Sequence, residues 1–212
     1  MNAMSKNSKK YMPTYIIIAL NIIVYLYTSI IGGNFVNTGE NAILWLGQVN
    51  FAIIYYGWYW QLFTSMFVHV SIIHLLGNMF FLLIFGLRAE ELFSIEEYIL
   101  IYLVSGLAGN FLTLLTTLLF GYNMISAGAS GAIFGLFGAC IIYVRRAVGQ
   151  SIMSALLYAF FLFMISSGPN VNNFAHLGGL VVGLLIGYVL GATRRRSVTP
   201  TYEHRYSFST RG

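Results

Sequence analysis

The chain has 212 residues, of which 58% are hydrophobic and only 8% are charged, and its formal net charge is +5. Soluble domains carry about 25% charged residues, so this composition excludes an ordinary soluble protein. Apolar runs long enough to cross a bilayer recur along the chain, and the predicted fold class is therefore an all-α polytopic membrane protein. Basic cytoplasmic segments explain the positive charge without a nucleic-acid partner. The single Cys140 excludes an intrachain disulfide framework.

Six apolar segments predict six transmembrane helices. They cover residues 13–31, 69–87, 98–120, 129–144, 151–166 and 174–192. The first run lacks a small-residue cleavage site, which favours a retained span over a signal peptide. We therefore expect one membrane domain over 13–192, between an N-terminal cytoplasmic segment, 1–12, and a basic polar cytoplasmic tail, 193–212.

The basic residues predict the orientation of these spans. All 11 Lys and Arg residues fall in the two termini or in the second and fourth links, which share one side of a six-span arrangement. The positive-inside rule places that side, with both termini, in the cytoplasm. One span more or fewer would scatter the charges over both sides.

The longest link, residues 32–67, is rich in aromatic side chains. It contains all three tryptophans, Trp45, Trp58 and Trp60. Because Trp and Tyr favour the membrane–water interface, this link is expected to lie partly in the outer leaflet. A link of this length in a compact chain is more often functional or semi-ordered than idle.

Two polar side chains, Ser126 and Ser130, lie in the stretch 126–135 at the start of the fourth segment. A serine hydroxyl becomes a useful nucleophile when a base takes its proton, and His176 in the sixth segment is the natural base. At about 1.5 Å per helical residue, Ser130 lies about 22 Å from Arg145, and His176 lies about 27 Å from Arg194. In a hydrocarbon core of about 30 Å, both fall in the outer half.

Glycine spacing predicts which helices meet. The sixth segment has a glycine every fourth residue, and the fourth segment has Gly131 and Gly135 at the same spacing. Faces of small residues let helices approach closely in lipid. Opposing these two faces would bring Ser130 and His176 together. The alternative is that the spacing marks any packing face.

The residue inventory limits the chemistry. The chain contains no Asp, and Glu40 is the one Glu outside the cytoplasmic side, so a Ser–His dyad is predicted rather than a triad. Backbone N–H groups at the start of the fourth helix can stabilise an oxyanion beside Ser130. His74 and Asn78 share one helix face and can donate to the same oxyanion, or instead form an interhelical hydrogen bond. The histidines lack acidic or Cys neighbours, so neither a metal site nor a cofactor is expected.

Three motifs resemble those of the rhomboid family of intramembrane serine proteases. Gly128-Ala129-Ser130-Gly131 resembles its Gly-x-Ser-Gly nucleophile motif. Ala175-His176-Leu177-Gly178-Gly179 resembles its Ala-His-x-Gly-Gly base motif. The spacing of His69, His74 and Asn78 is similar to its second-span motif. The resemblance extends over about 13–192, and the motifs appear in the family's order.

The resemblance implies a role for each matching residue. Ser130 would be the nucleophile and His176 the general base, while His74, Asn78 and the backbone at Ala129 would form the oxyanion hole. Structural positions near the site would be His69, Phe134, Gly128, Gly131, Gly179 and Gly183, with Glu90 structural at the inner end of the second span. The sequence departs from the family in two places. Gln61 follows Trp60 where Arg is common, so the outer loop is expected to be held differently, and Phe134 replaces a frequent Tyr.

The resemblance predicts an intramembrane serine endopeptidase that cleaves transmembrane protein substrates through an acyl-enzyme. The protein would lie in the lipid bilayer of the plasma membrane, with its active site open to the extracytoplasmic side. The alternative is a catalytically silent rhomboid-like protein that binds membrane clients, and the presence of both Ser130 and His176 argues against it. The lack of charged residues within the spans argues against an ion-coupled transporter. Substrate, organism and oligomeric state are left open.

Overall fold

A computed structural model describes residues 12–168 and 171–195. Predictions for residues 1–11, 169–170 and 196–212, including most of both terminal segments, lie outside the described residues. The described chain is helical apart from one short two-stranded ribbon. Its elements are α1 (Met12–Gly32), α2 (Glu40–Leu46), β1 (Gln48–Val49), α3 (Asn50–Tyr56), α4 (Gln61–Thr64), the 3-10 helix η1 (Ser65–Phe67), α5 (Ile72–Leu92), α6 (Ile95–Phe120), β2 (Ile125–Ser126), α7 (Ser130–Ala147), α8 (Met153–Ser166) and α9 (Asn173–Arg195).

Five described helices, α1, α5, α6, α7 and α9, are long and apolar enough to cross a membrane. Each overlaps one predicted span, and the protein is an integral membrane protein. Helix α8 coincides with the remaining predicted span, but its 14 residues extend only about 21 Å. That length is less than a hydrocarbon core of about 30 Å. The sixth crossing therefore stays a prediction.

Capping residues set where two of these helices begin. The second predicted span started at residue 69, but Ser71 has extended backbone and its side chain accepts a hydrogen bond from the His74 amide, so α5 begins at Ile72. Ser94 and Glu97 form a capping box that starts α6 at Ile95. In both cases a side chain satisfies an amide that has no partner within the helix.

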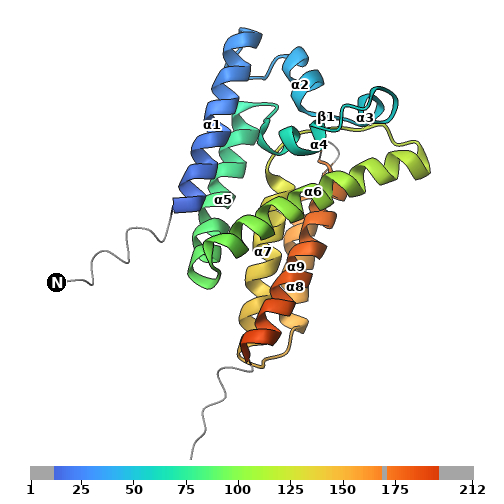
Figure 1. Cartoon of the computed structure of the whole chain (residues 1–212). Helices are drawn as coiled ribbons and strands as arrows, with labels where there is room; N and C mark the ends of the chain where they lie inside the picture. Colours follow the sequence, from blue (N-terminus) through green and yellow to red (C-terminus); the bar gives the residue numbers. More distant parts are fainter. Residues whose placement is uncertain (1–11, 169–170, 196–212) are drawn as a thin grey trace, which may run out of the picture.

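The most extensive helix contacts join α6, α7 and α9, while the buried hydrophobic core also includes residues of α1, η1 and α5. Figure 1 shows α7 and α9 side by side, with α6 crossing them obliquely and α1 lying along α5 at one edge. A methyl group added to Gly179 would lie 2.0 Å from the Gly131 carbonyl oxygen, and one on Gly183 would lie 2.1 Å from that of Gly135. The pairing of these glycine faces, predicted from their spacing, is confirmed. Backbones this close leave no room for a Cβ.

Helix α6 also uses glycine to join this core, which the sequence reasoning did not foresee. A methyl group on Gly109 would lie 2.4 Å from the carbonyl oxygen of Ala175 in α9. On Gly106 it would lie 2.1 Å from the Met66 Cε. The first turn of α9 is therefore enclosed by α6 on one side and α7 on the other.

One end of the bundle carries arginines and glutamates that form ion pairs. Arg194 near the end of α9 donates to both carboxylate oxygens of Glu97, at 2.8 and 2.6 Å, to the Leu92 carbonyl oxygen at 2.7 Å and to the Tyr143 hydroxyl at 3.1 Å. These bonds bring the ends of α5, α7 and α9 together beside the start of α6. On α5 nearby, buried Glu90 accepts a 2.7 Å hydrogen bond from the Thr14 amide in the first turn of α1.

The opposite end carries the long aromatic link, which is ordered into α2, α3, α4 and η1 (Figure 1). Trp58 stacks between Trp45 and Trp60, with ring centroids 4.6 and 5.4 Å away. Gln61 is fully buried, accepts from the Val49 amide at 2.9 Å and donates to the Leu44 carbonyl oxygen at 2.7 Å. A neutral amide both donates and accepts here, whereas arginine could only donate.

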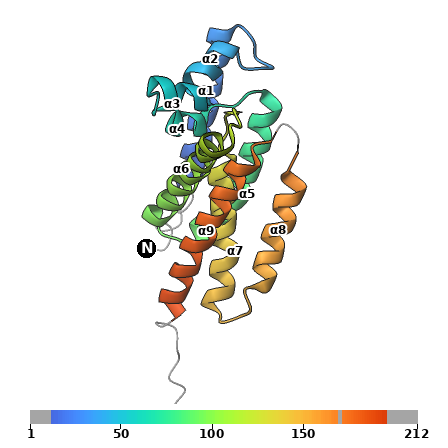
Figure 2. The ribbon, with the colours of Figure 1, turned by 90° about the vertical axis from the view of Figure 1, so that its right-hand side faces the viewer.

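Strand β1 of this link pairs antiparallel with β2, with Gln48 opposite Ser126 and Val49 opposite Ile125. The ribbon joins the long link to the segment that leads into α7. Helix α8 stands apart from the other helices and is nearest to α7 (Figure 2). Two of its residues, Ala155 and Ala159, are buried.

Candidate active site

Ser130 is the first residue of α7, as the sequence predicted. The chain reaches it through Gly128, whose φ of 127° lies in a region that side-chain-bearing residues rarely adopt. The Gly128 amide donates to the Ser65 carbonyl oxygen at 2.9 Å. A methyl group at Gly128 would lie 2.8 Å from His74 Cε1. Glycine is therefore required here both by the backbone turn and by the close approach of α5.

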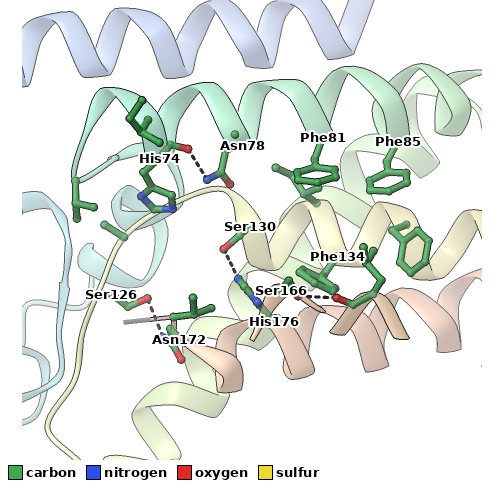
Figure 3. A pocket seen from close by; sticks show the side chains of 18 of the residues that line it. His74, Asn78, Phe81, Phe85, Ser126, Ser130, Phe134, Ser166, Asn172 and His176 are labelled. Atoms are coloured by element: carbon green, nitrogen blue, oxygen red, sulfur yellow. Dashed lines mark hydrogen bonds between the residues drawn. The ribbon is translucent and has the colours of Figure 1, made fainter. Parts of the chain in front are cut away.

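His176 lies in the first turn of α9 and faces Ser130 (Figure 3). The distance from His176 Nε2 to Ser130 Oγ is 2.9 Å, which is a hydrogen bond. The imidazole stacks on Phe134, one turn further along α7, with ring centroids 4.5 Å apart and planes at 23°. The ring at position 134 thus supports the histidine even though it lacks the hydroxyl of tyrosine.

These residues line a cavity of about 400 Å³ between α5, α7, α8 and α9. Its polar lining lies toward the aromatic-link end, and its apolar lining extends along the helices (Figure 3). The polar lining consists of His74, Asn78, Ser126, Ser130, Ser166, Asn172 and His176, and the aromatic lining consists of Phe81, Phe85, Phe134 and Phe137. An apolar cavity with a few convergent polar groups is the usual form of a ligand-binding site.

His74 and Asn78 lie one turn apart on α5 and both line the cavity across from Ser130 (Figure 3). The Asn78 Nδ2 donates to the His74 carbonyl oxygen at 2.9 Å. An added methyl at Gly128 would lie 3.9 Å from this Nδ2 as well as against the His74 ring. Both predicted oxyanion donors therefore lie beside the backbone at Gly128, which directly precedes the buried Ala129.

His69 lies in the extended segment before α5 and is fully buried. Its ring centroid is 5.2 Å from that of His74, and its carbonyl oxygen accepts from Thr38 Oγ1 at 2.5 Å. Burial, and secondarily the neighbouring His74, lower the pKa of His69 from 6.5 to about 3. A neutral imidazole behind the cavity wall fits a structural position. Gly131, Gly179 and Gly183 lie in the α7–α9 contact rather than in the cavity lining.

Three polar residues beside the dyad were not among the predicted site residues: Asn172, Ser126 and Thr113. Asn172 Nδ2 donates to Ser126 Oγ at 2.8 Å and to Thr113 Oγ1 at 2.9 Å. The sequence held two weak signals for them. Asn172 is an N-cap residue type directly before a helix, and Ser126 is one of the two polar side chains in the stretch 126–135.

The fold is thus a bundle of long apolar helices with a hydrogen-bonded serine and histidine at a cavity between them. The rhomboid domain family matches residues 56–193. The chain belongs to the rhomboid family.

Similar curated proteins come from plants and bacteria. The chain is 42% identical to RHOMBOID-like protein 6, mitochondrial, of Arabidopsis thaliana over 62% of this chain and 43% of that protein. It is 32% identical to the rhomboid protease GluP of Bacillus subtilis over 84% of this chain and 34% of GluP. It is 31% identical to the putative rhomboid protease YdcA of Bacillus subtilis over 85% of this chain and 89% of YdcA. The chain spans less than half the length of the first two relatives.

Proposed function

We propose that this chain is an active intramembrane serine endopeptidase that cleaves transmembrane protein substrates. The observation that carries the proposal is the 2.9 Å contact between His176 Nε2 and Ser130 Oγ at the cavity between α5, α7, α8 and α9. A nucleophile and its base within hydrogen-bond reach are the signature of covalent catalysis. The chain contains a rhomboid domain, and its relative GluP is named a rhomboid protease.

In the first step, Ser130 Oγ attacks a peptide carbonyl carbon while His176 Nε2 takes the hydroxyl proton. The C–N bond then breaks, and His176 returns the proton to the departing amine. Ser130 is left as an acyl ester. Water next attacks that ester, again losing a proton to His176, and releases the carboxylate product with Ser130 restored.

The negative oxygen that forms during attack would be stabilised from two sides. His74 and Asn78 supply side-chain donors from α5, and the backbone amides around Ala129 and Ser130 at the start of α7 supply the rest. The positive end of the α7 dipole adds to this stabilisation. With no carboxylate in the described part of the cavity lining, the imidazole depends on packing against Phe134 for its orientation.

The proposal includes a topology. Residues 13–192 would form one six-span domain, with α8 as the fifth crossing and both termini, within 1–12 and 193–212, in the cytoplasm. The described arginines Arg88, Arg145, Arg146 and Arg194 all lie toward one end of the helices that carry them, in keeping with the positive-inside rule. The cavity would open on the extracytoplasmic side of the plasma membrane, and substrate would enter laterally past α8.

Labelling with a fluorophosphonate probe tests the proposal without a known substrate. Purified wild type in detergent should be labelled, whereas Ser130→Ala and His176→Ala should fall to background, because neither retains an activated hydroxyl. Ser29→Ala, a buried serine on α1, should label like wild type. Thermal unfolding of all variants checks that the fold is kept.

Two results would count against the proposal. Labelling that persists in Ser130→Ala would remove Ser130 from the mechanism. A folded but unlabelled wild type would favour the alternative of a rhomboid-like protein that binds membrane clients without cleaving them.

A further inference from the structure

The imidazole of His176 is held without a charged partner. Its Nδ1 is buried and has no hydrogen-bond partner among the described residues. The ring is located by Ser130 at one nitrogen and by the face of Phe134. Its distance from Ser130 therefore depends on where the first turn of α9 sits relative to the start of α7.

Asn172 fixes that first turn by capping the helix. It directly precedes the helix, and its Oδ1 accepts from the Ala175 amide at 3.1 Å. Its carbonyl oxygen accepts from the His176 amide at 3.2 Å. These are the bonds of a helix N-cap, which satisfy amides that have no partner inside the helix. Asn172 thus sets the backbone that presents the imidazole.

The same side chain also reaches the segment that leads to the nucleophile. Its Nδ2 donates to Ser126 Oγ at 2.8 Å and to Thr113 Oγ1 on α6 at 2.9 Å. Ser126 lies four residues before Ser130, and Asn172 lies four residues before His176. The Asn172–Ser126 and His176–Ser130 hydrogen bonds therefore join the same two segments one after the other, and Figure 3 shows both.

The partners of Asn172 are themselves anchored. Ser126 belongs to β2 and stands opposite Gln48 in the ribbon. Thr113 is fully buried, and its hydroxyl also donates to the Gly109 carbonyl oxygen at 3.0 Å. Gly109 is the residue that brings α6 against Ala175. The side chain of Asn172 is therefore held between β2 and α6.

We propose that Asn172 is a positioning residue that sets the Ser130–His176 contact by tying β2 to the first turn of α9. This role rests on the proposed function, and Asn172 would place the imidazole through the backbone of α9 rather than by touching the ring. A small displacement of reacting groups can lower rates up to a hundredfold. A purely structural cap, in contrast, would affect stability but not the reactivity of Ser130.

Labelling kinetics at increasing fluorophosphonate concentration separate these roles. Asn172→Ala should lower the maximal labelling rate at least tenfold, with the half-saturating probe concentration within twofold of wild type. Asn172→Asp should restore the rate to within threefold of wild type, because its carboxylate can cap α9 and accept from both hydroxyls. Ser126→Ala should lower the maximal labelling rate by less than Asn172→Ala does, since it removes only the hydrogen bond between Asn172 and β2.

Ser94→Ala is the matched control, because Ser94 caps α6 at the other end of the bundle. It removes a helix cap of the same kind but should label within twofold of wild type. Equal labelling rates for Asn172→Ala and Ser94→Ala would overturn the proposal. So would an Asn172→Asp variant that is as slow as Asn172→Ala.

Amide hydrogen exchange tests, independently of catalysis, whether Asn172 joins β2 to the first turn of α9. Asn172→Ala should speed exchange in both 173–177 and 126–131, whereas a change confined to 173–177 would mean that Asn172 only caps α9 and would overturn the proposal. An unlabelled wild type would end the proposed function, and exchange in these two segments would then decide by itself whether Asn172 joins them.

Discussion

The two sides of the cavity differ in how they are held. Helix α7, which begins with Ser130, has eleven of its 18 residues buried and touches α9 backbone to backbone. Helix α8, on the other side, has two of its 14 residues buried. Both helices line the same cavity, yet one lies in the core and the other at the periphery.

This difference suggests that α7 and α8 have different roles at the cavity. Reacting groups must keep a fixed separation, so the dyad belongs on helices whose backbones are in direct contact. Regions with few buried contacts open at lower free energy, so α8 is the element of the cavity that can move most easily. This contrast is in keeping with the proposal, made from the family resemblance, that substrate enters past α8.

Breaking the closely packed side should have the largest effect. Gly183→Leu places a side chain where a methyl group would already lie 2.1 Å from the Gly135 carbonyl oxygen. We expect a loss of at least about 3 kcal/mol, at the upper end of overpacking costs, together with loss of fluorophosphonate labelling. Thermal unfolding in detergent measures the first effect, and in-gel fluorescence measures the second.

Gly183→Ala and Gly77→Ala form a matched pair for this prediction. A methyl group on Gly77 of α5 meets nothing within 4 Å, so Gly77→Ala should be neutral or stabilise the helix by up to about 1 kcal/mol. Gly183→Ala should destabilise. Similar midpoints for the two variants would contradict the close α7–α9 contact.

The start of α5 should respond to pH. Because burial lowers the pKa of His69 from 6.5 to about 3, the unfolded chain binds the proton more tightly than the folded one. The contribution of neutral His69 to the free energy of unfolding is therefore fully present above pH 6.5, and it is lost as the pH falls from 6.5 toward 3. At pH 5 the expected loss from this group is about 2 kcal/mol.

Unfolding midpoints at pH 7.5 and pH 5 would measure this loss, with His69→Gln as the comparison. The variant cannot titrate at this position, so its midpoint should change less over the same interval. An equal change in both proteins would show that His69 is not kept neutral by burial.

The smallest effect is expected on α8. Ala159 is buried beside Phe134, Phe137 and Leu180, but α8 can shift outward to admit a larger side chain. Ala159→Leu should therefore cost less than about 1 kcal/mol, whereas Ala139→Leu, which adds the same atoms to the core of α7, should cost about 1–3 kcal/mol. Equal losses of stability in Ala159→Leu and Ala139→Leu would contradict the proposed difference in packing between α8 and α7.

Much of this site was readable from local patterns. The motif residues Ser130, His176, His74 and Asn78 were named from the sequence, and the glycine spacing predicted the α7–α9 pairing that the structure confirms. Such patterns are readable because helix periodicity places residues four apart on one face, and because close helix contact in lipid requires small residues at that spacing.

Other features depend on contacts between distant segments. The sequence suggested that Gln61 would change how the outer loop is held, but only the fold shows its bonds to Val49 and Leu44. The packing of α6 against Ala175 was likewise not foreseen.

The sequence by itself determined the membrane class, the helical segments and the family motifs, and it predicted a dyad rather than a triad, because composition, periodicity and the absence of Asp are properties of the chain alone. Only the tertiary structure decided that Asn172 meets Ser126 and Thr113, and that Ser130 and His176 lie 2.9 Å apart. The physical reason is that an amide or hydroxyl has no preferred partner in the sequence. Its hydrogen bonds are assigned only when packing brings particular donors and acceptors within reach.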